Sequence, residues 1–283
     1  MTILVTGATG QVGGTVRGAL DARGVPWIGL SRRAPADERW RQADFERPAS
    51  LAPALDGIET VFLASSDHPR QDTLEVAMIE ACRARGVQHV VKLSAQSAGL
   101  EPPVSFGALH ARAEQALRES GMQWTVLRPV FFMQSLLFFA DSIATGKLIA
   151  ATGAGEVAFI DARDVAHVAA AALTRPAENA VYTLTGPRAL SFAALAGQLS
   201  TALGRPVRHI SPPRWVARIV LPWLSGKPRW QANLVIDLMA AISKGAQSRP
   251  TDTVARILGR EPHTIEEFIE EHRAAFAHKK PAV

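Results

Sequence analysis

Residues 1–14, MTILVTGATGQVGG, determine how the chain begins to fold. A short apolar run is followed by three glycines spaced three residues apart, Gly7, Gly10 and Gly13. Glycine is a poor helix former, yet residues 11–24 carry apolar side chains at helical spacing directly after the first two glycines. The stretch therefore predicts a strand, a tight turn and a helix, in that order.

The spacing of the glycines has a physical explanation in nucleotide binding. The first allows a tight turn, the second lets a pyrophosphate approach the backbone, and the third lets the helix pack closely on the strand. The helix that follows presents free N–H groups and a partial positive charge to the phosphates. A glycine-rich turn that only reverses the chain is the alternative, but the position between strand and helix favours a dinucleotide.

The first half of the chain alternates short apolar runs with helix-like segments, which is typical of a parallel sheet with crossover helices. Strands are expected in ILV, PWIGLSRR, TVFLAS, VQHVVKLSA and WTVLRPV. We predict an α/β fold, a Rossmann doubly wound parallel sheet with a smaller, mostly helical C-terminal substrate lobe. Residues 1–130, with parts of 155–185, are expected to form the dinucleotide-binding domain. Residues 131–154 and 186–283 are expected to form the substrate-binding lobe.

Composition limits the class of protein. The chain has 283 residues, of which 47% are hydrophobic and 20% charged, and no apolar run approaches the roughly eighteen residues of a membrane span. Cys82 is the only cysteine, so we expect no intrachain disulfide and a cytoplasmic location. The net charge is +5, but the basic residues are scattered, which disfavours nucleic-acid binding. We expect a small-molecule substrate, no membrane partner, and a monomer or homodimer.

The end of the second expected strand indicates which cofactor is bound. An acidic residue there would accept hydrogen bonds from the ribose of NAD, but the chain has Ser31, Arg32 and Arg33. Arginine suits a 2′-phosphate through charge-assisted contacts. The sequence predicts NADP(H), with a solvated basic turn as the alternative interpretation.

Three motifs together resemble the NmrA-like group of atypical short-chain dehydrogenases. They are TGATGQVGG, SRR and LRPVFFMQSLL, and the likeness extends from the first residue to about residue 210 through FIDARDVAHVAAAAL and YTLTGPRALSFAALAGQL. The group includes quinone reductases, triphenylmethane-dye reductases, isoflavone-reductase-type enzymes and redox-sensing regulators. The last seventy residues or so add little to the resemblance.

The resemblance implies a set of cofactor contacts. The pyrophosphate would be held by Gly7, Thr9, Gly10, Gln11 and Val12, and the 2′-phosphate side by Ser31, Arg32 and Arg33. The adenine would lie along Asp44 and Phe45, and the ribose on the nicotinamide side would be flanked by Leu63, Ala64, Ser65 and Ser66. The nicotinamide would lie near Ser94, Ala95 and Gln96, and the segment from Pro129 to Phe132 would close over it through Val130 and Phe131.

The chain departs from ordinary short-chain dehydrogenases, whose Tyr-x-x-x-Lys pair supplies the acid. Its only tyrosine, Tyr182, has no lysine four residues further on. In SFGALHARAEQAL, His110 falls where many relatives carry an active-site lysine. His110 is therefore our candidate catalytic residue, as a cofactor contact or as a proton donor. A structural histidine is the alternative.

Other groups are weighed against simpler roles. Asp161, Arg163 and Asp164 suit a strand end and helix cap better than acid–base chemistry. Asp67 and His68 do not assemble a zinc site, so we expect no metal. Substrate contacts are expected from Gln96, Phe132, Met133, Trp223 and Trp230, although the tryptophans could equally be packing residues.

These expectations define a function. We predict an NADPH-dependent reductase that transfers hydride to a quinone-like, enone or aromatic acceptor, in detoxification or natural-product tailoring. A regulator that senses NADP(H) and acts on a protein partner without turnover is the alternative, because sensing needs no catalytic tyrosine.

Overall fold

The computed structural model describes residues 1–101, 104–225 and 228–277, without the side chains of 223–225. Its centre is a seven-stranded sheet in the order β3-β2-β1-β4-β5-β6-β9. In that order the strands are Trp40–Gln42, Trp27–Ser31, Ile3–Val5, Thr60–Leu63, His89–Leu93, Gln123–Pro129 and Ala180–Leu184. All six pairings are parallel. The expected Rossmann-type sheet is confirmed, and its strand order reverses direction beside β1.

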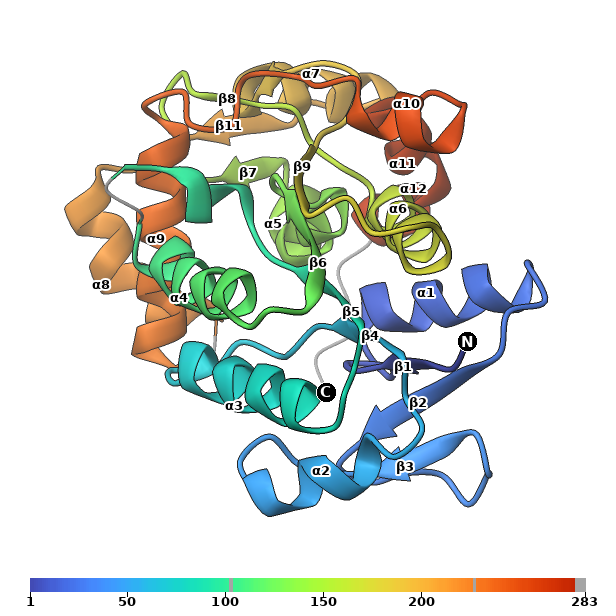
Figure 1. The fold of residues 1–283 in the computed structure, drawn as a ribbon. Helices are drawn as coiled ribbons and strands as arrows, with labels where there is room; N and C mark the ends of the chain where they lie inside the picture. The colour runs from blue at the N-terminus through green and yellow to red at the C-terminus, as the bar shows by residue number, and fades with distance from the viewer. Residues whose placement is uncertain (102–103, 226–227, 278–283) are drawn as a thin grey trace.

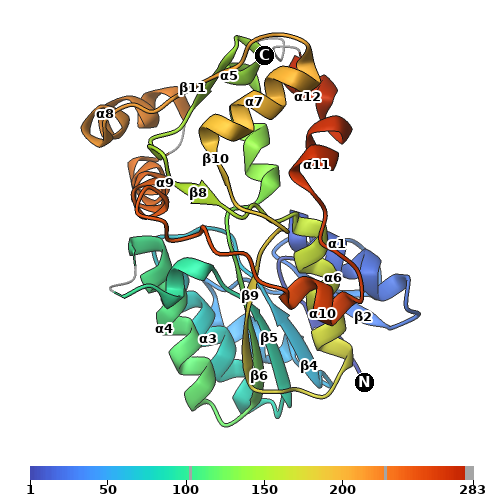
Figure 2. The ribbon, with the colours of Figure 1, turned by 90° about the horizontal axis from the view of Figure 1, so that it is seen from above.

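Helices cover both faces of the sheet (Figures 1 and 2). On one face lie α1 (Gln11–Asp21) and α6 (Ala162–Thr174), and on the other α3 (Gln71–Ala84) and α4 (Ser105–Glu119). The strands are consequently apolar on both sides. Leu4, for example, packs in one buried cluster while its neighbours Ile3 and Val5 pack in the other.

The smaller lobe lies beyond the carboxyl ends of the strands, as Figure 2 shows. It contains two small sheets, β7 (Lys147–Ile149) with β11 (Arg208–Ile210) and β8 (Glu156–Val157) with β10 (Leu190–Ser191). Its helices are α5 (Ala140–Ala144), α7 (Phe192–Leu203), α8 (Arg214–Ser225), α9 (Arg229–Ile242), α11 (Ile265–Glu271) and α12 (Arg273–Ala277). No helix within the described residues is long and apolar enough to span a bilayer.

Several short elements lie outside the sequence expectations. The edge strand β3 was not anticipated, nor were α2 (Leu51–Ala54) and the 3-10 helices η1 (Pro48–Ser50) and η2 (Gln96–Gly99). The aromatic run at Met133–Phe139 forms a 3-10 helix, η3, ahead of the short α5. Helix α10 (Thr253–Leu258), expected in the lobe, packs instead on the Rossmann core, where Val254 is fully buried.

Candidate cofactor and active site

The glycine turn at the end of β1 has the geometry that a phosphate site requires. Gly7 has φ +59°, and a Cβ on Gly13 would lie 2.3 Å from the Gly7 carbonyl oxygen. The N-cap of α1 is Gly10, which has no side chain to satisfy the first N–H groups of the helix. Thr9 and Gln11 are exposed beside it, and Val12 packs on the Rossmann core. The residues present therefore fit a dinucleotide pyrophosphate.

The turn is fixed to the neighbouring strand at the point where the strand order reverses. The Thr6 hydroxyl donates to the Ala64 carbonyl at 2.7 Å and accepts from the Ala64 N–H at 2.8 Å. Leu63 and Ala64 are buried here, and Ser66 is exposed at the surface that follows. The first and fourth strands thus present their carboxyl ends as one rigid edge.

The end of β2 carries the two arginines as expected. Arg32 and Arg33 are exposed, and among the described residues neither guanidinium makes a hydrogen bond or ion pair. Ser31 accepts from the Arg33 N–H at 3.3 Å, which shapes the turn. Following β3, Asp44 accepts from the Glu46 N–H at 3.1 Å. Phe45, the next residue, packs against the core on the α3–α4 face.

A buried charged cluster that the sequence interpretation missed lies below the carboxyl end of β5. Lys92 and Glu75 are both 0% exposed and form an ion pair. The Lys92 ammonium also donates to the Leu93 carbonyl at 3.1 Å and lies 3.4 Å from Nδ1 of His110. On the other side, the Ser65 hydroxyl donates to Glu75 at 2.8 Å. The cluster connects a predicted cofactor residue, Ser65, with the predicted catalytic one.

Burial and neighbouring groups together set the charge of two residues in this cluster. Burial opposes ionisation of Glu75, but the Lys92 ammonium, the His110 ring and two hydrogen bonds outweigh it, so the pKa of this carboxyl is lowered. His110 is 5% exposed, and burial, followed by the nearby ammonium, lowers its pKa to about 4. His110 is therefore neutral near pH 7, so its ring can donate a hydrogen bond but is not a charged acid.

A second buried carboxylate holds the loop after β5. Ser94 donates to Glu114 of α4 at 2.6 Å. Arg128 of β6 binds the same carboxylate through two bonds of 2.9 and 2.6 Å, and Arg118 binds it at 2.8 Å. Although burial opposes ionisation, these bonds lower the pKa of Glu114.

The predicted nicotinamide contacts lie just beyond Ser94. Ala95 and Gln96 are partly exposed where η2 begins. Gln96 Oε1 is buried and has no hydrogen-bond partner among the described residues. A buried acceptor without a partner fits the carboxamide N–H of a nicotinamide.

The segment after β6 links the two cores. Val130 is buried and its N–H donates to the Leu184 carbonyl at 3.1 Å. Phe131 packs edge-on against Phe159 and Phe192 in the lobe. Phe132 packs on the Rossmann core instead. Met133 is only 1% exposed inside the lobe core, which leaves almost no surface for the substrate contact we expected.

Helix α9 approaches the loop after β4. Gln231 donates to Asp67 at 3.0 Å, which brings the half-buried Trp230 near this part of the molecule. The side chain of Trp223 lies outside the described residues. The described part of the chain contains no group of three or more His, Cys, Asp or Glu side chains able to hold a metal ion.

The interpretation of Asp161 as a helix cap is confirmed. Its side chain accepts from the Arg163 N–H at 2.7 Å at the start of α6, and Arg163 pairs with it at 2.8 Å. These bonds outweigh burial and lower the pKa of Asp161. Tyr182 donates to Glu178, and burial and that carboxylate raise its pKa to about 12. The phenol is therefore engaged away from any lysine partner.

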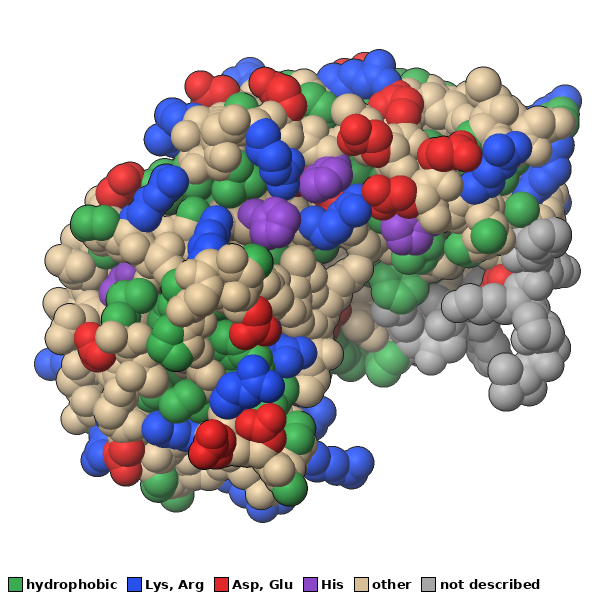
Figure 3. All heavy atoms as spheres, turned by 90° about the vertical axis from the view of Figure 1, so that its right-hand side faces the viewer, with side chains coloured by type: hydrophobic (Ala, Val, Ile, Leu, Met, Phe, Trp, Pro, Cys, Tyr) green, Lys and Arg blue, Asp and Glu red, His purple; other side chains and the backbone are tan. Residues whose placement is uncertain are grey.

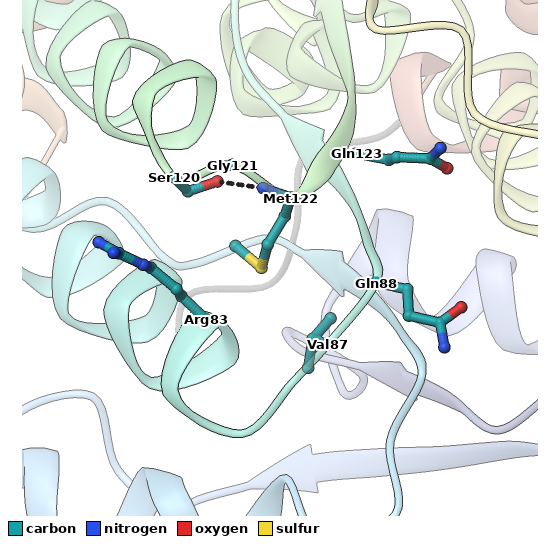
Figure 4. A pocket seen from close by; sticks show the side chains of 7 residues that line it. All are labelled: Arg83, Val87, Gln88, Ser120, Gly121, Met122 and Gln123. Atoms are coloured by element: carbon teal, nitrogen blue, oxygen red, sulfur yellow. Dashed lines mark hydrogen bonds between the residues drawn. The ribbon is translucent and has the colours of Figure 1, made fainter.

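A surface pocket of about 500 Å³ lies at the opposite end of the strands, where β5 and β6 begin (Figure 4). It is lined by Arg83, Val87, Gln88, Ser120, Gly121, Met122 and Gln123. In Figure 4 the Arg83 and Gln123 side chains point away from each other, so the polar groups do not converge. Ligands of doubly wound sheets bind at the carboxyl ends of strands, and this pocket lies at the start of β5 and β6. We therefore place the candidate functional site at the carboxyl ends of the strands and not in this pocket.

The fold and the glycine turn define a dinucleotide-binding Rossmann protein. A family profile described as NAD(P)H-binding matches residues 7–176. An NAD(P)H azoreductase of Xenophilus azovorans is 37% identical over 97% of this chain and 99% of its own. The chain belongs to this family of NAD(P)H-binding proteins. Its resemblance to NmrA-like reductases and its class, oxidoreductase, are thereby confirmed.

Solved structures agree with this assignment. An NADPH-dependent quinone oxidoreductase of Escherichia coli, in complex with NADPH, superposes with a TM-score of 0.88 at 28% identity, covering 95% of this chain and 99% of that one. The triphenylmethane reductase of Citrobacter sp., in complex with NADP(H), superposes with a TM-score of 0.83 at 26% identity, covering 94% and 98%. The expected nicotinamide cofactor is thus confirmed at the level of NAD(P)H.

Proposed function

We propose that this protein is an NADPH-dependent reductase that transfers hydride to quinone-like, enone or aromatic small molecules. The observation that carries the proposal is the similarity along almost the whole chain to reductases whose names specify azo, quinone and triphenylmethane acceptors. These acceptors share a planar, electron-poor π-system. When bound, the nicotinamide supplies the hydride, and the protein supplies position and a site that excludes water.

The preference for NADPH over NADH rests on the end of β2. Arg32 and Arg33 are exposed, and no carboxylate of the described residues neutralises them. Ser31, the last residue of β2, lies where NAD-specific proteins carry an acid. Two free guanidinium groups would bind a 2′-phosphate through charge-assisted hydrogen bonds.

The arrangement near His110 suits acceptors that need little acid assistance. The ring is neutral near pH 7, so it presents an N–H, which is a weaker acid than a charged imidazolium. Ser94, Ala95 and Gln96 would lie against the nicotinamide, while Gln96, Phe132 and Trp230 remain the described candidates for substrate contact. Simple ketones, which need stronger acid help, are disfavoured as substrates.

The test incubates purified protein and NADPH with a panel of quinones, enones, azo dyes and cationic triphenylmethane dyes. Loss of the reduced-nicotinamide absorbance with at least one class is the expected result. Tight NADPH binding with no oxidation by any acceptor would contradict the proposal and favour an NADP(H) sensor. A loss with NADH equal to that with NADPH would contradict the assigned cofactor preference.

A further inference from the structure

The charged pair inside the layer between β5, α3 and α4 calls for an explanation beyond stability. Lys92 and Glu75 are 0% exposed, and Lys92 follows the apolar pair Val90 and Val91 in its strand. Taking two charges out of water is costly, and well-packed apolar residues usually serve a core equally well. A buried pair at the carboxyl edge of a sheet, below a cofactor site, is therefore a candidate for a chemical role.

The pair is extended at both ends by groups that can carry a proton. Ser65, partly exposed after β4, donates to Oε1 of Glu75 at 2.8 Å, and Gln71 donates to the same oxygen at 3.3 Å. Lys92 binds Oε2 of Glu75, and its Nζ lies 3.4 Å from Nδ1 of His110. These contacts form an unbroken series from the partly exposed Ser65, through Glu75 and Lys92, to the imidazole of His110.

The second buried carboxylate near these residues, Glu114, already has its own hydrogen-bond partners. Glu114, on the same helix as His110, is bound by Arg128 of β6, Arg118 of α4 and Ser94. The charged groups that act on the His110 ring are Lys92, Glu75 and Glu114, and among the described residues only Lys92 contacts a ring nitrogen.

The contact with Lys92 sets the tautomer of the imidazole. An ammonium group has three donors and no acceptor, so Nδ1 of His110 must accept from it. The ring proton is then on Nε2. Within the described residues Nε2 has no hydrogen-bond partner, so its N–H is available to a ligand.

We propose that Ser65, Glu75, Lys92 and His110 form a proton relay that serves the reducible acceptor. This inference rests on the reductase function proposed above. His110 is the residue that would touch the substrate, and Lys92 and Glu75 act through it. The relay takes the place of the missing Tyr-x-x-x-Lys pair.

The relay step balances in protons and electrons. A reduced nicotinamide bound here would give up hydride from one of its C–H bonds to a carbon of a quinone or enone, and the electron pair displaced there would move onto the acceptor oxygen. That oxygen takes the proton of His110 Nε2, while Nδ1 takes a proton from the Lys92 ammonium, so the imidazole stays neutral. Lys92 becomes an amine beside Glu75. After the product leaves, Nε2 takes a proton from solvent and Nδ1 returns its proton to Lys92, so the ammonium, its pair with Glu75 and the Nε2–H tautomer are all restored.

Comparing two acceptors distinguishes a proton relay from a purely structural cluster. A quinone needs both hydride and a proton, whereas a cationic triphenylmethane dye is neutralised by hydride alone. The double variant Lys92→Met with Glu75→Gln removes both charges of the pair, so that neither is left buried without its partner. We expect its kcat for the quinone to fall on the order of 100-fold relative to its kcat for the dye. His110→Phe should give the same selective loss.

The matched control is His89→Asn. His89 is a buried histidine at the other end of the same strand, bound to Thr125 at 3.1 Å and outside the relay. Its quinone-to-dye ratio should equal that of the wild type. Equal losses with both acceptors in the relay variants would assign the cluster a structural role and overturn the proposal. Wild-type protein that reduces neither acceptor would refute the reductase function instead.

A second readout does not depend on activity. Nitrogen-15 NMR of histidine-labelled protein without cofactor reports which ring nitrogen of His110 is protonated. The Nε2–H tautomer is expected in the wild type, with a mixture of tautomers in the double variant. An Nδ1–H tautomer in the wild type would overturn the relay, because Nδ1 could not then accept from Lys92.

Discussion

The imidazole of His110 lies in a space where its charged form is unfavourable. Burial removes its hydration, and the Lys92 ammonium, 3.4 Å away, adds a like charge. The sequence suggested this position only through a resemblance, and it gave no reason to connect His110 with residues 75 and 92. A lysine and a glutamate in amphipathic segments are most often surface residues, so their meeting in the interior was not predictable from spacing.

The lowered pKa of His110 has a consequence for folding. An unfolded chain protonates this ring with a pKa near its ordinary 6.5, whereas the folded state holds it at about 4. The unfolded state therefore binds more protons in this window, and the stability contributed by the neutral ring is lost as pH falls from about 6.5 to about 4. Between pH 7 and pH 5 the free energy of unfolding should fall by about 2 kcal/mol because of this group.

Urea unfolding of the wild type and of His110→Phe at both pH values measures this contribution. The variant should lose less stability on acidification, while the contribution of His89, whose pKa burial also lowers to about 4, remains in both proteins. Identical pH dependence of the two proteins would contradict the neutral, buried state of the ring.

We expect the two arginines at the end of β2 to determine the preference for NADPH over NADH. Reversing both charges with Arg32→Glu and Arg33→Glu should weaken NADPH binding by about 100-fold, on the basis of roughly 1.5 kcal/mol for each charge-assisted contact. NADH binding should change far less, because NADH has no 2′-phosphate. Calorimetric titration with both cofactors gives the ratio, and equal losses would show that the arginines do not bind the phosphate.

Among the elements, the β1–α1 unit was the most predictable. Its strand, turn and helix are specified by residues within about twenty positions of one another, so local sequence contains the pattern. The segment Met133–Phe139 was harder, because its apolar residues are compatible with several helical forms. Packing of the lobe core around Met133 and Leu136 accompanies a 3-10 helix here. Edge strand β3 is three residues long, too short for any periodicity to show.

The close packing of α1 on the turn after β1 can be tested with two glycines of that helix, Gly13 and Gly18. A Cβ on Gly13 would lie 2.3 Å from the Gly7 carbonyl oxygen, so Gly13→Ala must push α1 away from the turn. We expect a loss of about 2 kcal/mol or more in stability and loss of measurable NADPH binding. Gly18→Ala is the control, since nothing lies within 4 Å of its added Cβ. That variant should gain up to about 1 kcal/mol and keep cofactor affinity.

At the scale of the whole molecule, several parts of the chain connect the Rossmann core with the lobe. The segment after β6 passes between them, and Asp161, the cap of α6, accepts from Gln134 of η3 at 2.8 Å. Another connection is the segment between α10 and α11, which returns to α6. There, fully buried Asp164 accepts from the His263 N–H at 2.7 Å and pairs with Arg260 at 2.7 Å. Helices α6 and α10 lie on the right of Figure 1, and Figure 3, which shows the molecule from that side, has histidines among interspersed acidic and basic side chains.

Asp164→Ala should weaken the attachment of the lobe. It leaves the His263 N–H and the Arg260 guanidinium without their buried acceptor, so we expect a loss of about 2 to 3 kcal/mol in the free energy of unfolding. The control is Glu266→Gln in the exposed pair with Arg188, for which a change within about 1 kcal/mol is expected. Thermal or urea unfolding of both variants decides the matter. Equal effects would mean that the buried seam contributes no more than a surface pair.

By itself the sequence determined the glycine turn, the alternation of strands and helices, the arginines at the end of the second strand and the cap of α6. Each of these is set by neighbouring residues, and the physics of turns, helix ends and periodicity acts over short distances along the chain. Only the tertiary structure decided that Ser65, Glu75, Lys92 and His110 meet, that α10 returns to the Rossmann core, and that Met133 is enclosed. Those outcomes depend on parallel crossovers that bring distant segments together and on the exclusion of water from the space between them.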